Sequence, residues 1–345
     1  MGLAGPRVTS QCAASLAGVD LEPGQPGHRR FARIHAFGVP ERDGFALARF
    51  RRRAEASRDN CRMTARRLDG QALAGEIFDQ VAALVAARVA DRKPRPALAT
   101  ILVGDDPASA IYVRTKQRNA ARVGIETGDH RLPSATTTAE LVELVTTLNA
   151  DDDISGVLIQ QPVPAHIDMT RVIAALDPVK DVDGFHPVNA GLLALGLPGG
   201  VEPCTPAGIV ELLEHASVGV SGANAVVVGR SNLVGKPVAL LLLKRHATVT
   251  ICHTRTRDLA AHTRGADILV AAAGKLELIK KDMVKPGAAV VDVGANWLEG
   301  KQVGDLAPGV EEVAGWLTPN PGGVGPMTRA MLIRNTYQAE ARRRP

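Results

Sequence analysis

From Met63 onward, the apolar residues of this 345-residue chain alternate between two spacings. Residues 73–89 place apolar side chains three and four positions apart, which is typical of an amphipathic helix, whereas 98–103 is a short apolar run that predicts a buried strand. The same patterns predict helices over 107–124, 139–148, 235–245, 258–263 and 329–343, and strands over 156–159, 225–228, 248–252, 268–271 and 289–293. This alternation is typical of α/β proteins with parallel sheets.

The periodicity lapses between Asp177 and Gly208, in segments rich in proline and glycine, where we expect a domain boundary and polar groups at a cleft. The four strands that follow, with helical crossovers, favour a doubly wound nucleotide-binding sheet. We therefore predict an α/β fold of two domains with the active-site cleft between them. They are a parallel-sheet substrate domain over 63–203, completed by the closing helix over 326–345, and a Rossmann-like domain over 204–325.

Charge and hydropathy narrow the possible partners. Residues 1–62 hold 11 arginines and 6 acidic residues and so account for the whole formal charge of +5. The remaining chain is neutral, which does not indicate a nucleic-acid partner. The longest aliphatic run, 238–243, is far shorter than the roughly 18 apolar residues that a membrane span needs. We expect neither nucleic acid nor a membrane as partner.

Residues 1–62 show no sustained period and have a composition that indicates disorder. The plainest explanation is that translation starts at Met63 and that the segment is an upstream extension. A transit peptide would be rich in arginine, as here, but poor in acids. A basic arm around Arg49 and 51–53 is the third explanation. No apolar core of a signal peptide is visible, so we expect a cytoplasmic protein.

Cysteine and histidine usage indicates neither a disulfide framework nor a metal site. Cys12, Cys61, Cys204 and Cys252 lie far apart without a CxxC pair, and the nine histidines form no HExxH motif.

A candidate dinucleotide site lies in the turn VVVGRSNLVGKP. Gly229 and Gly235 allow a tight turn into a helix whose free N–H groups can hold a pyrophosphate. The spacing is not a strict GxGxxG, and a plain strand-to-helix turn is the alternative. An NAD site usually places a carboxylate after the next strand. Here no acid precedes Asp258, while donors and positive charge come from Arg230, His253, Thr254, Arg255 and Arg257. We therefore expect NADP rather than NAD.

The first block holds candidate catalytic groups. Tyr112 and Lys116 stand four residues apart on a predicted helix and share a face, and a desolvated lysine beside a tyrosine can serve proton transfer. Gln160 ends a strand, where α/β proteins place ligand contacts. Asp181 and Asp183 add carboxylates on the KDVDG loop. The plainer alternatives are a solvated lysine beside a packed tyrosine, and simple turn chemistry for the aspartates.

Seven motifs, in order, together carry a resemblance that none carries alone. They are YVRTK at 112–116, QQPVP at 160–164, PVKDVDGFHPVNAG at 178–191, PCTPAG at 203–208, GRSNLVGKP at 229–237, VDVGAN at 291–296 and PGGVGPMT at 321–328. Over residues 63–345 the chain resembles the bifunctional methylenetetrahydrofolate dehydrogenase/cyclohydrolase family. The resemblance implies oxidation of 5,10-methylenetetrahydrofolate by NADP, then hydrolysis of the methenyl product to 10-formyltetrahydrofolate.

The resemblance also implies roles for individual residues. Lys116 would manage protons in the hydrolysis, and Gln160 would hydrogen-bond the lysine amine. Tyr112 would pack against the folate, and Asp183 would bind the pterin ring. The folate-side loop would contribute Pro321, Gly322, Gly325 and Thr328. The cofactor contacts would be Gly229, Arg230, Ser231, Gly235, Thr254 and Ala295.

The chain departs modestly from the family's usual motifs. Gln161 and Val163 replace the leucines of QLPLP, Asn320 replaces the valine of TPVPGG, and Ala295 replaces a bulkier aliphatic residue. None of these changes removes a catalytic group, so we expect altered affinity or rate rather than lost activity.

The resemblance implies tetrahydrofolate derivatives as ligands and a homodimer. Two alternatives are another two-domain NADP dehydrogenase, such as a shikimate dehydrogenase type, and a silent folate-binding relative. The first lacks the motif series, and retention of all four catalytic groups argues against the second.

Overall fold

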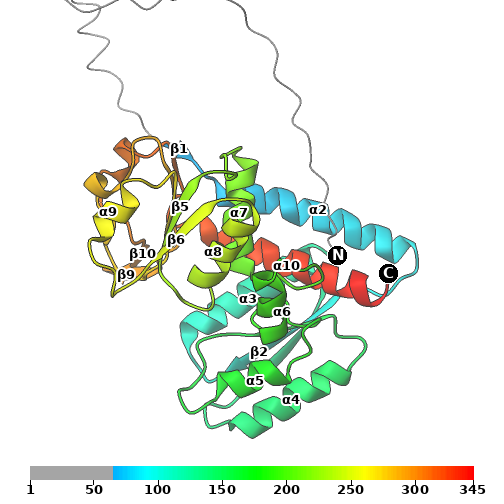
Figure 1. Ribbon diagram of the computed structural model, residues 1–345. Coiled ribbons are helices and arrows are strands. Elements are labelled where there is room, and N and C mark those ends of the chain that lie inside the picture. The colour runs from blue at the N-terminus through cyan, green and yellow to red at the C-terminus, as the bar shows by residue number, and fades with distance from the viewer. Residues whose placement is uncertain (1–64) are drawn as a thin grey trace, which may run out of the picture. The chain divides into compact units, whose positions relative to one another are not determined.

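The computed structural model of the protein describes residues 65–345, and the three explanations for residues 1–62 concern a segment outside them (Figure 1). The described chain is an α/β structure with two parallel sheets, as predicted. Within residues 65–345, no helix combines the length and the apolar character needed to cross a membrane.

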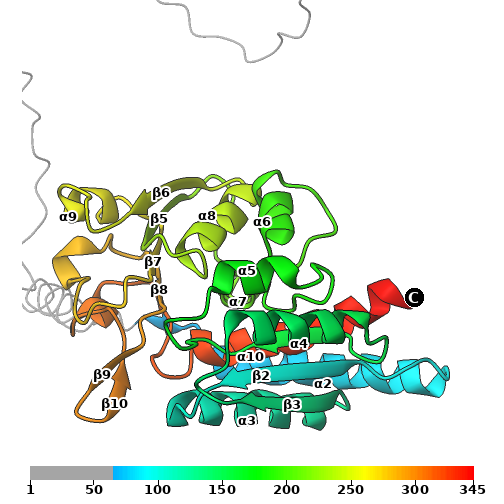
Figure 2. The ribbon, with the colours of Figure 1, turned by 90° about the horizontal axis from the view of Figure 1, so that it is seen from below.

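The first lobe is built on a three-stranded parallel sheet in the order β3-β2-β4. Its strands are β2 (Ala97–Val103), β3 (Glu126–Leu132) and β4 (Gly156–Ile159). One face packs on α4 (Thr138–Ala150) and α5 (Met169–Ala175), and the other on α2 (Gly70–Ala90), α3 (Pro107–Arg122) and α10 (Val324–Arg343) (Figure 2). Helices therefore bury both faces, which is why β2 is apolar at nearly every position.

The second lobe is built on a six-stranded parallel sheet in the order β1-β11-β8-β7-β5-β6. Its strands are β1 (Arg66–Arg67), β5 (Asn224–Val228), β6 (Thr248–Cys252), β7 (Ile268–Ala271), β8 (Ala289–Asp292) and β11 (Trp316–Leu317). The chain moves from β5 outward to β6 and then crosses to β7 on the other side of β5. This reversal of direction makes the carboxyl ends of β5 and β7 the expected ligand crevice of a doubly wound sheet.

Alternate residues of these strands face two different cores. Ala225 and Val227 of β5 join the cluster that contains α8 (Gly235–Lys244), while Val226 and Val228 face the cluster beneath α9 (Leu259–Thr263). A short hairpin of β9 (Asn296–Leu298) and β10 (Lys301–Val303) stands apart from both sheets (Figure 2).

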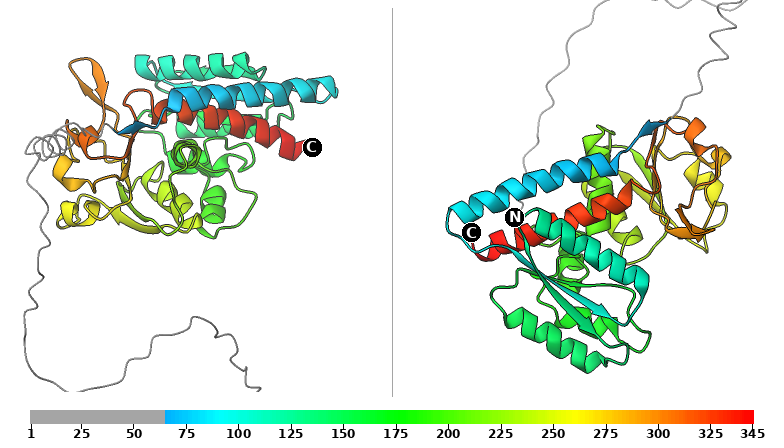
Figure 3. Two further views of the ribbon diagram at one scale, coloured as in Figure 1. Left: turned by 90° about the horizontal axis from the view of Figure 1, so that it is seen from above. Right: turned by 180° about the vertical axis from the view of Figure 1, so that it is seen from behind.

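Helices α7 (Cys204–His215) and α10 connect the two lobes. One side of α7 belongs to the core of the first lobe through Cys204 and Leu212, and its other side to the core of the second through Ile209 and Leu213. Helix α10 runs beside both α2 and α7, and α6 (Pro187–Ala194) contacts α8 (Figure 3). The lobes thus share packed helices instead of meeting only through a linker.

Most predicted elements are confirmed to within a few residues, and the strands 156–159, 248–252 and 268–271 match in full. The structure also contains elements that the sequence did not predict, among them the exposed edge strand β3, the short helix α5 and the β9–β10 hairpin. The lapse over 177–208 contains α6 and the start of α7, and α10 begins at Val324 instead of 329. The division between domains at 203 and 204 stays a prediction, and β1, although early in the chain, pairs with β11 of the second lobe.

A buried ion pair fixes the far end of α10. Glu340, with no exposed side-chain surface, accepts from Arg88 of α2 at 3.0 Å, and the Arg88 side chain is only 5% exposed. The second carboxylate oxygen accepts from the Ser155 hydroxyl at 2.9 Å, and that hydroxyl accepts from the Ala97 amide, also at 2.9 Å. One carboxylate therefore ties α2 and α10 to the starts of β2 and β4.

We predict that Glu340→Ala lowers the free energy of unfolding by about 3–5 kcal/mol, because it leaves the Arg88 guanidinium buried without its carboxylate. Urea unfolding followed by circular dichroism measures the change. The control is Asp282→Ala, which removes an exposed pair with Arg264 and should cost less than about 1 kcal/mol. Equal losses in both variants would contradict a special role for the buried pair.

Candidate functional site

Two adjoining cavities, of about 530 Å³ and 310 Å³, lie where α3 approaches the start of α10. Both are lined by the same four residues: Tyr112, Gly325, Thr328 and Arg329. The larger cavity also reaches residues after β8 in the second lobe, including Ala295, and the smaller reaches Lys116 and Gln160 in the first. Together they make a cleft between the two sheets.

Helix α3 positions Tyr112 and Lys116. It begins at Pro107 after Asp106, whose carboxylate caps it by accepting from the Ser109 amide at 2.7 Å. Hydrogen bonds from the Ser109 hydroxyl and the Ser109 amide lower the pKa of the Asp106 carboxyl. One turn apart, Tyr112 and Lys116 both line the smaller cavity, and the Tyr112 side chain is largely exposed to it.

The amine of Lys116 lies 3.1 Å from Oε1 of Gln160, to which it donates. Gln160 follows β4 and is 8% exposed, and its Nε2 donates to the Gln161 carbonyl. This second bond holds the amide with its oxygen toward the lysine. One lysine proton is therefore directed at Gln160, while the amine stays at the wall of the cavity.

The KDVDG loop holds two buried side chains that serve the fold, Lys180 and Asp181, and one partly exposed carboxylate, Asp183. Lys180 is 1% exposed and donates to three carbonyls at the end of α4, those of Leu148, Asn149 and Asp151. Asp181 is also buried and accepts from the amides of Gly184 and His186 and from Asn189. Burial raises the pKa of the Asp181 carboxyl, against the effect of these hydrogen bonds. Both side chains are fully used within the fold.

Asp183, by contrast, lies between buried and exposed and faces Cys204, the first residue of α7. Burial raises the pKa of the Cys204 thiol, the charge of Asp183 acts in the same direction, and the charge of Lys116 opposes it. Since Asp183 and Lys116 both act on one thiol, the fold brings these two charges to the same region.

The PGGVGPMT segment forms the turn that opens α10. Pro321, Gly322, Gly325 and Thr328 all line the larger cavity. The Thr328 hydroxyl lies 2.9 Å from that of Thr205 on α7, which attaches this turn to the helix shared by both lobes. The peptide bonds before Pro162 and Pro321 are both cis.

The turn after β5 is tight at two glycines, as the sequence predicted. Gly229 has a φ of +134°, and a Cβ there would lie 2.1 Å from the Ala272 carbonyl oxygen after β7. A Cβ on Gly235, where α8 begins, would lie 2.3 Å from the carbonyl oxygen of Gly229. The Ser231 hydroxyl accepts from the amides of Val234 and Gly235. The close approach of backbone at both glycines makes the turn from β5 into α8 tight, and Ser231 caps the start of the helix.

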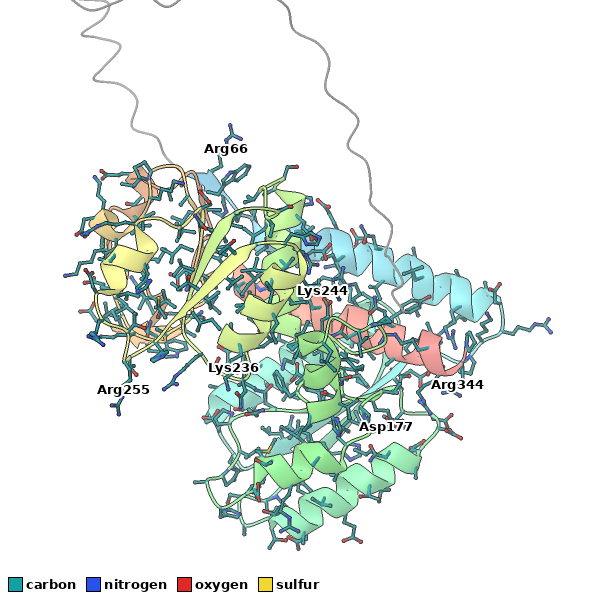
Figure 4. The ribbon with its side chains drawn as sticks, viewed as in Figure 1. Arg66, Asp177, Lys236, Lys244, Arg255 and Arg344 are labelled. Atoms are coloured by element: carbon teal, nitrogen blue, oxygen red, sulfur yellow. The ribbon has the colours of Figure 1, made fainter. Side chains whose placement is uncertain are left out.

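The cluster after β6 carries free positive charge. Thr254, Arg255 and Arg257 are exposed, as is Arg230 after β5, and within residues 65–345 none of these arginine side chains is paired with a carboxylate. Figure 4 shows Arg255 pointing away from the end of β6, and Lys236 at the start of α8. Asp258 is occupied as the cap of α9, where it accepts from the Ala261 amide. These positively charged residues suit the ribose 2′-phosphate of NADP better than the free ribose 2′-hydroxyl of NAD.

Sequence reasoning missed Asp305, which shapes the loop after β7. Its carboxylate accepts from three successive amides, those of Ala273, Gly274 and Lys275, while its own amide donates to Asp292, the last residue of β8. Burial raises the pKa of the Asp292 carboxyl. No local motif could have indicated this, because the partners are about thirty residues away.

Arg329 was also missed, although it directly follows the PGGVGPMT motif and lines both cavities of the cleft. A further cavity of about 680 Å³ lies between α5 and α8 and is lined by Gln161, Phe185, Asn232 and Lys236 among others. It borders the same turn after β5 and contains none of the predicted catalytic groups.

Comparison with known proteins identifies the relatives of this chain. The catalytic domain of the tetrahydrofolate dehydrogenase/cyclohydrolase family matches residues 68–183, and the NAD(P)-binding domain of that family matches residues 203–344. The bifunctional protein FolD of Sorangium cellulosum is 56% identical over 283 residues, which cover 81% of this chain and 99% of the relative. That of Moorella thermoacetica is 54% identical and covers 81% and 100%.

Solved structures agree with the sequence relatives. The FolD methylenetetrahydrofolate dehydrogenase/cyclohydrolase of Campylobacter jejuni superposes with a TM-score of 0.79 at 44% identity, covering 80% of this chain and 98% of that one. The Trypanosoma brucei enzyme, solved with NADP and an inhibitor, superposes with a TM-score of 0.77 at 36% identity, covering 81% and 98%. The chain therefore belongs to the bifunctional tetrahydrofolate dehydrogenase/cyclohydrolase family.

Proposed function

We propose that the cleft oxidises 5,10-methylenetetrahydrofolate with NADP to the methenyl cation and then hydrolyses that cation to 10-formyltetrahydrofolate, two steps of one-carbon metabolism. The observation that carries this proposal is the contact between Lys116 and Gln160 at the wall of a cleft that also reaches Ala295. A proton-carrying amine and Ala295, which we assign to the cofactor, thus border the cleft that binds one folate.

The dehydrogenase step needs mainly the orientation of two rings. When bound, NADP supplies the acceptor for the hydride that leaves the methylene carbon. Tyr112 packs against the folate, and Asp183 binds the donor edge of the pterin. Pro321, Gly322, Gly325 and Thr328 form the opposite wall. Fixing the two reactants together lowers the entropic part of the barrier.

The cyclohydrolase step needs a group that moves protons. Water adds to the methenyl carbon, the bond from that carbon to N5 breaks, and one proton is released overall. The Lys116 amine lies at the cavity wall and carries protons to and from the reacting atoms, while Gln160 is a positioning residue that holds the amine in place. The substrate is already a cation, so water attack is favoured from the start.

We predict that Lys116→Met lowers the rate of methenyltetrahydrofolate hydrolysis by about 100-fold or more, because it removes the proton carrier. The decay of methenyl absorbance measures hydrolysis, and NADPH formation measures the dehydrogenase step separately. Lys93→Met, which changes an exposed lysine outside the cleft, is the control. Near-normal hydrolysis by Lys116→Met would refute the assignment.

The charges around the second-lobe turns support NADP over NAD. The 2′-phosphate is held by Arg230 and Arg257, with Thr254 beside them, and Gly229, Ser231 and Gly235 hold the pyrophosphate at the start of α8. Among the described residues of the turn after β6, no carboxylate that would repel the phosphate precedes Asp258.

We predict that replacing Arg230 and Arg257 by Met raises the KM for NADP about 10-fold or more, because charge-assisted hydrogen bonds to the phosphate are lost. The KM for NAD should change by less than about 2-fold, since NAD has no phosphate for these side chains to bind. Steady-state assays with each cofactor measure both values, with Arg264→Met as control. Equal changes for the two cofactors would place the phosphate elsewhere.

We also propose a homodimer formed through the second lobe. Strand β6 is the last strand of the six-stranded sheet, so one of its edges has no neighbour among the described strands. Ile251 of that strand is 41% exposed, and Leu243 at the end of α8 is 58% exposed. An open edge beside apolar side chains favours pairing with another copy. A cytoplasmic location stays a prediction.

We predict that light scattering of the full chain at micromolar concentration gives twice the mass of one chain. Ile251→Lys should shift the mass toward that of a monomer, because it places a charge on the proposed contact. A monomeric wild-type protein would contradict the dimer.

A further inference from the structure

Arg329 is a partly buried cation that contacts no carboxylate among residues 65–345. It stands on the second turn of α10 and lines both cavities of the cleft, beside Tyr112 and Gly325. No hydrogen bond or ion pair within residues 65–345 involves its guanidinium, whereas Arg334 of the same helix and Arg88 of α2 each contact a carboxylate. Partial burial of an unpaired charge costs free energy, so its retention needs a reason.

The surroundings of Arg329 do not neutralise it. Burial lowers the pKa of the Arg329 guanidinium, Tyr112 acts in the opposite direction and the charge of Arg118 lowers the pKa further, yet an arginine side chain stays protonated. Two carboxylates line the cavities. Asp106 caps α3, and Asp292 accepts from the amides of Gly294 and Asp305. Both are already engaged, so the cleft presents a positive group that awaits an anion.

The position of Arg329 indicates which bound molecule supplies the anion. The smaller cavity, which Arg329 shares with Lys116 and Gln160, is lined by no residue of the six-stranded sheet or its turns. The arginines proposed for the cofactor phosphate line neither of the two cavities that Arg329 borders. The folate therefore lies closer to Arg329 than the cofactor phosphates do. The negative charges of a tetrahydrofolate are the carboxylates of its glutamate tail.

We propose that Arg329 binds a carboxylate of the glutamate tail of the folate and thereby sets the affinity for glutamylated substrates, with Arg118 adding positive charge nearby. This inference rests on the proposed function. A planar guanidinium can pair with a carboxylate through two parallel hydrogen bonds, which fixes orientation as well as charge. With Tyr112 beside it, Arg329 would hold the tail while Lys116 and Gln160 address the reacting carbon.

Arg329→Met tests the proposal with two substrates, 5,10-methylenetetrahydrofolate and the corresponding tetrahydropteroate, which lacks the glutamate. We expect the KM for the folate to rise about 10-fold to 100-fold, as for a lost hydrogen bond between charged groups. The KM for the pteroate, the KM for NADP and kcat should change less than about 2-fold, since the variant leaves the reacting groups in place. Arg329→Lys should recover part of the lost affinity for the folate, because lysine restores the positive charge but cannot form the two parallel hydrogen bonds of a guanidinium.

Two further variants keep the test independent of folding. Arg118→Met changes an exposed side chain and should raise the KM for the folate about 2-fold to 5-fold through lost long-range attraction. Arg95→Met changes an exposed arginine between α2 and β2 that lines neither cavity of the cleft, and it should have no effect.

Three results would overturn the proposal. The first is an equal rise in KM for both folate and pteroate, and the second is no rise for either. The third is a rise in the KM for NADP in place of the folate, which would assign Arg329 to a cofactor phosphate. Failure of the proposed function itself is a separate outcome, because the wild-type protein would then turn over neither substrate.

Discussion

The packing of α10 between α2 and α7 is the constraint on which the rest of the structure depends. Its first turns carry Thr328 and Arg329 into the cleft, and its last turns carry Glu340 to the buried contact with Arg88. Because α7 belongs to the cores of both lobes and touches α10, the separation of the two sheets follows from one packed layer. The cleft is therefore a product of the core and not of a flexible joint.

The polar residues fall into two groups that differ in what they already contact. Lys180, Asp181 and Asp305 are buried with their hydrogen-bonding capacity used by backbone groups, so they shape loops and offer little to a ligand. Lys116 and Arg329 face the cleft with capacity to spare. The motif KDVDG illustrates the distinction, since Lys180 and Asp181 are buried while Asp183 of the same loop is partly exposed, and composition alone cannot separate them.

Sequence reasoning succeeded where a local pattern determines structure. Short apolar runs bounded by turns predicted the buried strands, and the glycines around Gly229 predicted the tight turn of the second lobe. It failed for β3, an edge strand whose ETGDHRL sequence lacks apolar alternation, and for α7, whose start is hidden by prolines. Asp305 and Arg329 were missed because their roles depend on groups distant in the chain, which spacing does not encode.

The pairing of α2 with α10 joins the beginning of the described chain to its end, with Arg88 and Glu340 252 positions apart. During synthesis the second lobe, which is continuous except for β1, can bury most of its sheet before α10 leaves the ribosome. The apolar face of α2 packs mainly on α10, so part of it stays uncovered until the last helix arrives. The first lobe thus begins to leave the ribosome before the second but completes its packing later. Its helix α2 is the segment most exposed to chaperones and proteases in the meantime.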